Sequence, residues 1–387
     1  MAKMKIGIIG CGTIANNAHI PNYLKNEEVE IKYFCDILLW KAEKCVEKYG
    51  CGIAVEDYHE VINDPEIVAV SVCTPNKMHS IISCDALRAG KNVLCEKPAA
   101  RTYADALLMQ EAQHETGKVL NIGVVNRFNS AVNKLREMIQ SGEFGEVYHV
   151  YVSFRAQRSI PGLGGAFTTN AISGGGVLID WGVHYLDIVM YCLGDPAPKT
   201  VSAKAFSKLG VDMPNYVYEG MWAEDTKDLN GTYDVDDFVT GFVRTEGATI
   251  TFNGAWAQNI GIGESYIDFI GTKAGARLNY GGDFTVYSTA CGCLVDCKPK
   301  FPHTDHFENE INSFIRCIQT GEKLPSHIDT VIVTAKMMQA MYDSSARGEE
   351  IKLSNGNVLR RRRFGFAAVF LWERIQYAIE IYRRCVR

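Results

Sequence analysis

Residues 5–21 read KIGIIGCGTIANNAHIP. A short apolar run is followed at once by two glycines and then by a helix-like stretch that ends at Pro21. This order matches the G-x-G-x-x-A fingerprint of dinucleotide-binding turns. In such turns glycines let the backbone approach a pyrophosphate, and the first N–H groups of the helix receive the phosphates. The candidate cofactor contacts in this segment are Gly10, Gly12, Thr13 and Ile14.

An acidic residue follows the second apolar run of the sequence. Residues 29–35 read as a strand, and Asp36 stands directly after it, 21 residues beyond Ala15. A carboxylate at this place can accept hydrogen bonds from both hydroxyls of the adenosine ribose, and it repels a 2′-phosphate. We therefore expect the cofactor to be NAD rather than NADP.

Strand-like and helix-like runs alternate through the rest of the first 123 residues. The strand-like runs are 68–73, 92–95 and 119–124, and helical patterns at 80–89 and 102–115 separate them. This alternation predicts an α/β domain, residues 1–123, with a doubly wound parallel sheet of the Rossmann type. Ligands bind such sheets at the carboxyl ends of strands. Polar residues at those ends complete the predicted cofactor site: Thr74, Pro75, Asn76, His79, Glu96 and Lys97.

A different pattern begins after Val124. Short alternating runs predict a second domain, residues 124–353, with helices and a large open, mostly antiparallel sheet: 147–155, 200–206, 237–245, 249–256, 266–270 and 284–287. Four aromatic residues on these runs either form a contact between subunits or fill the core of one chain: Tyr148, Phe154, Phe252 and Trp256.

The motifs together resemble one known family. They are GCGTIANNAH at 10–19, CD at 35–36, CTPNKMH at 73–79 and CEKP at 95–98. This set is similar to the glucose–fructose oxidoreductase, inositol dehydrogenase and rhizopine catabolism (Gfo/Idh/MocA) family, over nearly all of residues 4–353. The resemblance implies an NAD-dependent oxidoreductase acting on sugars or inositols, and a homodimer or homotetramer assembled through the C-terminal sheet.

The segment SGGGVLIDWGVHYLD, residues 173–187, carries the predicted acid–base chemistry. Asp180, His184 and Asp187 are spaced by four and three residues, so that an α-helix would place them on nearly one face. A carboxylate that holds one nitrogen of His184 would fix the tautomer and raise the basicity of the other nitrogen. The segment also resembles the family's GGG-x-x-x-D-x-x-x-H pattern, which implies that Lys97, Asp180 and His184 are catalytic.

These residues predict oxidation of a secondary alcohol to a ketone. His184 would take the hydroxyl proton, Lys97 would hydrogen-bond the reacting oxygen, and Asp180 would position the substrate and tune the pair. The predicted substrate contacts are Asn126, Arg127, Arg155, Asp180 and His184. Each arginine has the alternative of an ion-paired surface residue. His303 and His306 are two further residues that could border the cleft.

Three other functions compete with this prediction. One is a glycosidase that keeps NAD bound, another is a sugar-sensing regulator, and the third is a periplasmic oxidoreductase that recycles its own cofactor. The trio of Lys97, Asp180 and His184 weighs against a regulator. Residues 1–5 lead directly into the first strand without an export signal, so we expect a cytoplasmic protein.

Charge is distributed unevenly over the 387 residues, whose net charge is −5. The last 33 residues hold eight Arg and two Glu, a local +6, which leaves −11 for the rest. An acidic body argues against nucleic acid as the main partner.

Thirteen cysteines, an odd number, fit reduced thiols. The cluster of Cys291, Cys293 and Cys297 reads as a surface loop, and we expect no metal site.

The basic extension, residues 354–387, lies beyond the family resemblance. Its uncharged run, 364–372, has nine residues, whereas a membrane-spanning helix needs about 20. We therefore expect no membrane span. A helix docked on the body or on a partner subunit, a disordered or foreign appended segment, and a membrane-surface helix remain the three interpretations.

Overall fold

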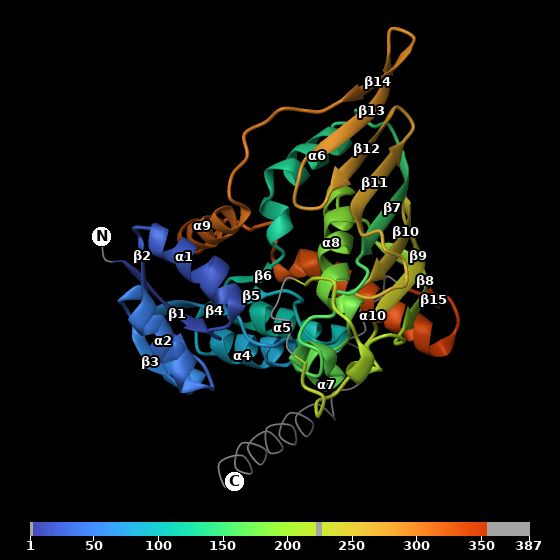
Figure 1. Cartoon of the computed structure of the whole chain (residues 1–387). Coiled ribbons are helices and arrows are strands. Elements are labelled where there is room, and N and C mark those ends of the chain that lie inside the picture. The colour runs from blue at the N-terminus through green and yellow to red at the C-terminus, as the bar shows by residue number, and fades with distance from the viewer. Residues whose placement is uncertain (1–2, 222–226, 354–387) are drawn as a thin grey trace. The chain divides into compact units, whose positions relative to one another are not determined.

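The fingerprint segment folds as a strand that runs into a helix, as the sequence predicts. The computed structural model describes residues 3–221 and 227–353 (Figure 1). In this part of the chain, a six-stranded sheet of order β3-β2-β1-β4-β5-β6 is parallel throughout. Its strands are β1 (Met4–Ile9), β2 (Val29–Cys35), β3 (Ile53–Val55), β4 (Ile67–Val72), β5 (Asn92–Glu96) and β6 (Leu120–Gly123). The order reverses between β1 and β4, which places the ligand crevice of such sheets beside the carboxyl end of β1.

Helices connect these strands and bury both faces of the sheet. They are α1 (Ile20–Lys25) after the π-helical turn η1 (Ala15–His19), α2 (Leu39–Tyr49), α3 (Tyr58–Asn63), α4 (Asn76–Arg88) and α5 (Tyr103–Thr116). Ile6 and Ile8 of β1 are fully buried, as expected for a strand covered on both sides. Local chemistry fixes several helix ends: the Thr102 hydroxyl accepts the N–H of Asp105, and Gly117 ends α5 in the left-handed conformation. The predicted Rossmann domain is confirmed.

The second sheet is large and mixed. Among the described residues it has nine strands in the order β14-β13-β12-β11-β7-β10-β9-β8-β15, and β7 and β10 form its parallel pair. The strands are β7 (Val147–Arg155), β8 (Pro198–Phe206), β9 (Phe238–Thr245), β10 (Thr249–Ala255), β11 (Glu264–Gly271), β12 (Ala274–Asn279), β13 (Phe284–Ala290), β14 (Cys293–Cys297) and β15 (Ile351–Lys352). The predicted mostly antiparallel sheet is confirmed, although β12, β14 and β15 are additional strands.

One face of this sheet is packed and the other carries exposed side chains. The packed face is covered in part by α8 (Val183–Cys192) and α10 (Ile328–Arg347), beside α6 (Ser130–Gln140) (Figure 1). Phe154, Phe252 and Trp256 are buried in that core, whereas Tyr148 is 49% exposed. Three of the four aromatic residues therefore fill the core of one chain. Tyr148 is exposed and stays a candidate for a subunit contact, and so is its neighbour on β7, Tyr151.

The chain returns to the first sheet near its end. Helix α9 (His306–Thr320) places Ile311, Phe314 and Ile315 in the same apolar cluster as Ile6 and Ile8 of β1. The remaining short helices are η2 (Val125–Phe128), η3 (Ala166–Thr168), α7 (Asn170–Ser173), η4 (Leu178–Gly182) and η5 (Met213–Asn215). The first domain therefore takes part of its core from residues beyond 300, and the domain limits at 123 and 353 stay predictions.

Three other expectations concern the cysteine cluster, a membrane span and the C-terminal extension. Cys291, Cys293 and Cys297 are exposed on the β13–β14 hairpin, and the described residues contain no cluster of three side chains suited to a metal. Within residues 3–221 and 227–353 no helix is long and apolar enough to cross a membrane. The interpretations of the extension 354–387 lie outside the described residues.

Candidate active site

Lys97 and Asp180 form an ion pair between the two halves of the described chain. Lys97 directly follows β5, and its Nζ lies 3.1 Å from Oδ1 of Asp180 and 3.4 Å from the Asp180 carbonyl oxygen. Burial would lower the pKa of Lys97, but the negative charges of Asp180 and Glu96 outweigh it and raise that pKa above its ordinary value. Lys97 is therefore a charged hydrogen-bond donor at neutral pH.

The glycine-rich segment before Asp180 packs against a buried carboxylate. Asp236 accepts the N–H of Gly176 at 2.8 Å and the N–H of Leu178 at 3.0 Å, and the Tyr342 hydroxyl donates to it at 2.8 Å. A Cβ on Gly176 would lie 1.9 Å from the Asp236 carbonyl oxygen, so only glycine fits there. This contact fixes the start of η4, the turn that carries Asp180.

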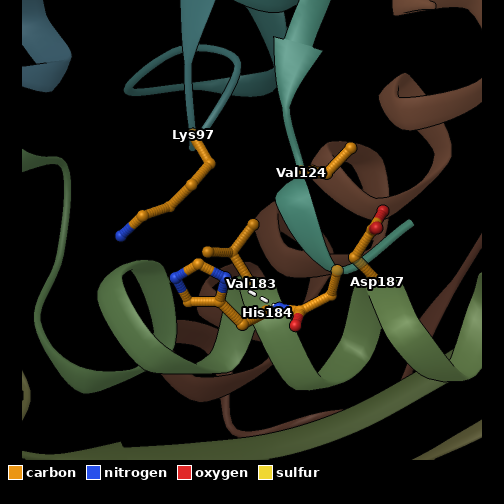
Figure 2. Close-up of a pocket in the computed structure, with 6 residues that line it drawn as sticks. Lys97, Val124, Val183, His184 and Asp187 are labelled. Atoms are coloured by element: carbon orange, nitrogen blue, oxygen red, sulfur yellow. Dashed lines mark hydrogen bonds between the residues drawn. The ribbon is translucent and has the colours of Figure 1, made fainter. Parts of the chain in front are cut away.

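His184 lies beside Lys97 in a pocket (Figure 2). The pocket is lined by Lys97, Val124, Asn126, Val183, His184 and Asp187. Figure 2 shows the Lys97 side chain directed toward the imidazole ring. Burial, followed by the charges of Lys97 and His306, holds the pKa of His184 well below its ordinary value. The imidazole is therefore neutral at pH 7 and able to accept a proton.

The fingerprint turn has the shape that a pyrophosphate needs. Gly10 has a φ of +95°, and a Cβ there would lie 2.5 Å from the Cys73 carbonyl oxygen. At Gly12 a Cβ would meet nothing within 4 Å, which leaves open space that any side chain would fill. The N–H groups of Thr13 and Ile14 begin the helix beside this space. These residues fit a dinucleotide.

Two further groups at the strand ends suit the same ligand. Asp36 is partly exposed, and its carboxylate accepts the N–H groups of Cys11 and Leu38 at 2.9 Å each, which leaves lone pairs on both oxygens. The Thr74 hydroxyl, after β4, is buried and has no hydrogen-bond partner among the described residues. Buried polar groups of this kind usually have a partner, which a bound ligand can supply.

Comparison with known proteins agrees with this geometry. A family model described as an oxidoreductase family with an NAD-binding Rossmann fold matches residues 4–124, and the Gfo/Idh/MocA C-terminal domain matches residues 132–277. The chain belongs to the Gfo/Idh/MocA oxidoreductase family. It is 30% identical over 355 residues to D-glucoside 3-dehydrogenase of Escherichia coli, covering 91% of this chain and 98% of that protein. It is also 29% identical over 192 residues to myo-inositol 2-dehydrogenase of Thermotoga maritima, covering 50% and 55% of the two chains.

Solved structures share the fold of this Gfo/Idh/MocA protein. Levoglucosan dehydrogenase in complex with NADH and levoglucosan superposes with a TM-score of 0.78 at 19% identity, covering 91% of this chain and 100% of the other. Aldose-aldose oxidoreductase from Caulobacter crescentus gives a TM-score of 0.76 at 23% identity with the same coverage. The family resemblance and the fold class predicted from the sequence are thus confirmed.

The predicted acidic stripe around His184 does not form. Asp187 instead holds Arg127, accepting from Nε and Nη2 at 2.8 Å each. Asp180 lies in the π-helical turn η4, so its spacing from His184 is not one regular α-helical turn. Among the described residues no carboxylate hydrogen-bonds the His184 ring, and the ring's Nδ1 lies 3.4 Å from Nδ2 of Asn126. The prediction that an acid raises the basicity of His184 is wrong.

The two predicted substrate arginines are occupied by other partners. Arg127 is fully buried, pairs with Asp187 and Asp195, and donates to the Pro325 carbonyl oxygen at 3.1 Å. Arg155 pairs with Glu264 and donates to the Ser153 hydroxyl. Arg127 has no donor left for a substrate, so its prediction as a substrate contact is wrong, and Arg155 does not line the pocket. Asn126 does line it.

Three predicted cofactor contacts serve as internal links. His79 is buried between the carbonyl oxygens of Thr74 and Pro98, at 2.8 Å from each, and so ties two strand-end turns together. Glu96 is buried and pairs with His19 at 2.8 Å. The Asn76 amide donates to the Ser173 carbonyl oxygen at 2.8 Å. His79 in particular has no free nitrogen for a cofactor, which corrects its prediction. Pro75 directly precedes α4, and its contact with the cofactor stays a prediction.

Tyr280 is a pocket neighbour that the sequence patterns did not reveal. It follows β12, its hydroxyl lies 3.4 Å from Nδ2 of Asn126, and its ring centroid lies 6.1 Å from that of His184. Of the two histidines considered for the cleft border, His306 acts electrostatically on His184, whereas His303 pairs with the exposed Asp283. Tyr280 lies in a turn between strands and belongs to no sequence motif, so only the fold identifies it as a neighbour of the pocket.

Proposed function

We propose that this oxidoreductase transfers a hydride from a ring carbon bearing a secondary hydroxyl, in a sugar or inositol, to NAD+. The observation that carries the proposal is the position of Lys97, 3.1 Å from Asp180 and beside His184 in one pocket. The directions of their pKa shifts, upward for Lys97 and downward for His184, agree with a charged donor beside a neutral acceptor. A donor and a proton acceptor at one place are what oxidation of an alcohol requires. The relatives named for D-glucoside and myo-inositol oxidation support this class of substrate.

His184 and Lys97 have different roles in the oxidation of the hydroxyl. NAD+, when bound, accepts the hydride from the carbon while the carbon–oxygen double bond forms. His184 accepts the proton that the hydroxyl loses, and Lys97 donates a hydrogen bond to the same oxygen as its charge develops. For Nε2 of a neutral His184 to accept a proton, Nδ1 must carry the ring hydrogen. The Nδ1–H group then donates a hydrogen bond to the Asn126 amide oxygen, which takes the place of Nδ2 when the amide is flipped.

Asp180 supports a substrate with more than one hydroxyl. Its Oδ1 is engaged by Lys97, whereas Oδ2 is buried and has no partner within the described residues. A buried carboxylate oxygen without a donor is costly. A second hydroxyl of the substrate would supply that donor, and a simple alcohol would not. The proposal therefore favours polyhydroxylated rings over isolated secondary alcohols.

We also infer that NAD is preferred over NADP, and expect Asp36→Ala to test this. Loss of charge-assisted bonds to ribose hydroxyls should raise the Kd for NAD+ by about 10- to 100-fold, while binding of NADP+ improves because the repelling carboxylate is gone. Isothermal titration with both cofactors measures the two changes. Asp296→Ala, on β14, is the matched control.

The two titrations of Asp36→Ala separate two roles of the residue. Asp36 also holds the Cys11 N–H in the fingerprint turn. A disordered turn would weaken binding of both cofactors equally, and that outcome would contradict the proposed role in cofactor choice.

The exposed face of the C-terminal sheet supports a proposal on assembly. Tyr151 on β7 is 51% exposed and lies on the face of the strand opposite the buried Val150 and Val152, and Tyr148, near the start of the same strand, is 49% exposed. Large side chains of this kind on an open sheet favour a subunit contact. We therefore retain the homodimer or homotetramer as part of the proposed function.

The function itself is tested by a substrate panel. Purified protein is incubated with NAD+ and methyl D-glucosides, free sugars or inositols, and NADH absorbance is followed with time. We expect NADH to accumulate with at least one polyol. Cleavage of a glycoside without accumulation of NADH would instead support the glycosidase alternative, and binding without any reaction would support the sensor.

A further inference from the structure

Tyr280 is held rigidly at the pocket by a stack of aromatic rings. Its ring centroid lies 4.5 Å from that of Tyr185 at an interplanar angle of 21°, and Tyr185 lies 5.0 Å from Phe154 at 27°. Phe154 is fully buried in the sheet core. Packed aromatic pairs of this geometry resist rotation and displacement. The core of the second sheet thus fixes the position of the Tyr280 ring.

The hydroxyl of Tyr280 lies beside Asn126 and within electrostatic reach of Lys97 and Asp180. It lies 3.4 Å from Nδ2 of Asn126, and the charges of Lys97 and Asp180 both act on it. Burial raises the pKa of Tyr280 above its ordinary value, so the phenol is protonated at neutral pH. The residue is nevertheless 38% exposed. Tyr280 thus lies partly exposed beside Asn126, which lines the pocket.

The phenol keeps a free hydrogen-bonding position in either orientation of the Asn126 amide. If the amide donates, the Tyr280 O–H remains free. If the amide oxygen faces Tyr280, the phenol donates to it and its lone pairs remain free. A substrate hydroxyl is both a donor and an acceptor, so it can pair with Tyr280 in both cases.

We propose that Tyr280 is a specificity-determining residue that binds a hydroxyl of the substrate other than the reacting one and the one held by Asp180. The inference rests on the proposed function. Three hydroxyls are then recognised: one by Lys97 and His184, one by Asp180 Oδ2, and one by Tyr280. The site is thereby complementary to a ring with three hydroxyl-bearing carbons, as in pyranosides and inositols.

The experiment is a double-mutant cycle between Tyr280→Phe and deoxy sugars. The phenylalanine keeps the ring that stacks on Tyr185 and removes only the hydroxyl. Isothermal titration of NADH-loaded protein with methyl D-glucoside and with its 2-, 3-, 4- and 6-deoxy analogues measures Kd without turnover. We expect Tyr280→Phe to raise the Kd of the parent sugar by about tenfold, as for loss of one hydrogen bond.

The decisive result is the pattern over the analogues. One deoxy sugar, which lacks the hydroxyl bound by Tyr280, should bind wild type and Tyr280→Phe equally, while the other analogues keep the tenfold difference. Tyr287→Phe, an exposed tyrosine on β13, should bind every sugar as wild type does. Equal melting temperatures check the fold of each variant.

Two outcomes would overturn the inference, and they differ in what else they affect. If Tyr280→Phe binds all sugars like wild type, or weakens all of them by the same factor, Tyr280 recognises no particular hydroxyl, and the dehydrogenase proposal stands if NADH still forms. If no sugar or inositol binds wild type, both this inference and the proposed substrate class fail.

Discussion

Lys97→Met should lower kcat/KM for polyol oxidation by about 10²- to 10³-fold, the usual cost of removing one donor at a developing oxyanion. The ammonium is the group that can donate to the reacting oxygen, and methionine preserves the length of its aliphatic chain. The change also leaves the buried Asp180 carboxylate without its partner at 3.1 Å. Initial rates of NADH formation measure the loss, and NADH fluorescence shows whether the cofactor still binds.

The control for this variant is Lys134→Ala. Lys134 is exposed on α6 and pairs with Glu137 along the same helix, so its loss should leave the rates unchanged. Near-normal kcat/KM in Lys97→Met would contradict the role of Lys97. Loss of NADH binding would instead show that the residue acts through the cofactor site.

His184→Asn should lower kcat by about 10²- to 10⁴-fold, the range for a proton-transfer residue. Asparagine fills part of the same volume but accepts no proton near neutral pH. In wild type, His184 must be neutral to act, and its pKa lies well below the ordinary 6.5. Activity should therefore be constant from neutral pH down to 6.5 and fall only at lower pH, as the imidazole becomes protonated.

The pH profile also links the two residues. Burial and then the Lys97 charge lower the pKa of His184, so the residual activity of Lys97→Met should begin to fall at a higher pH than that of wild type. His59→Asn, an exposed histidine paired with Asp57, serves as the control. If the residual activity of His184→Asn falls at low pH as that of wild type does, another group is responsible for the fall.

The first domain could be predicted from the sequence because its signals are local. The turn at Gly10 and Gly12, the acid at Asp36 and the alternation of strands and helices each lie within a few tens of residues. The parallel sheet then brings the strand ends together by topology alone. The Lys97–Asp180 contact joins residues 83 apart, and only the family's motif pattern indicated it.

The rest of the site depends on contacts that spacing does not encode. The acidic stripe assumed a regular α-helix from Asp180 to Asp187, whereas η4 is π-helical. The sequence does not show that Arg127 is occupied, because its buried partners Asp187 and Asp195 lie 60 or more residues away and meet it only in the fold. Tyr280 reaches Asn126 across 154 residues and carries no motif. Strand β12 carries a weak signal because Gly275 interrupts its alternation, and β14 carries none because its five residues have no buried face.

Deuterium transfer tests the central claim most directly. A polyol substrate identified in the panel is deuterated at its carbinol carbons and incubated with NAD+, and the NADH and the sugar product are analysed by mass spectrometry. Direct hydride transfer predicts one deuterium in each NADH and an equal amount of ketone. NADH without deuterium, or consumption of the sugar with neither NADH nor ketone, would contradict the dehydrogenase assignment.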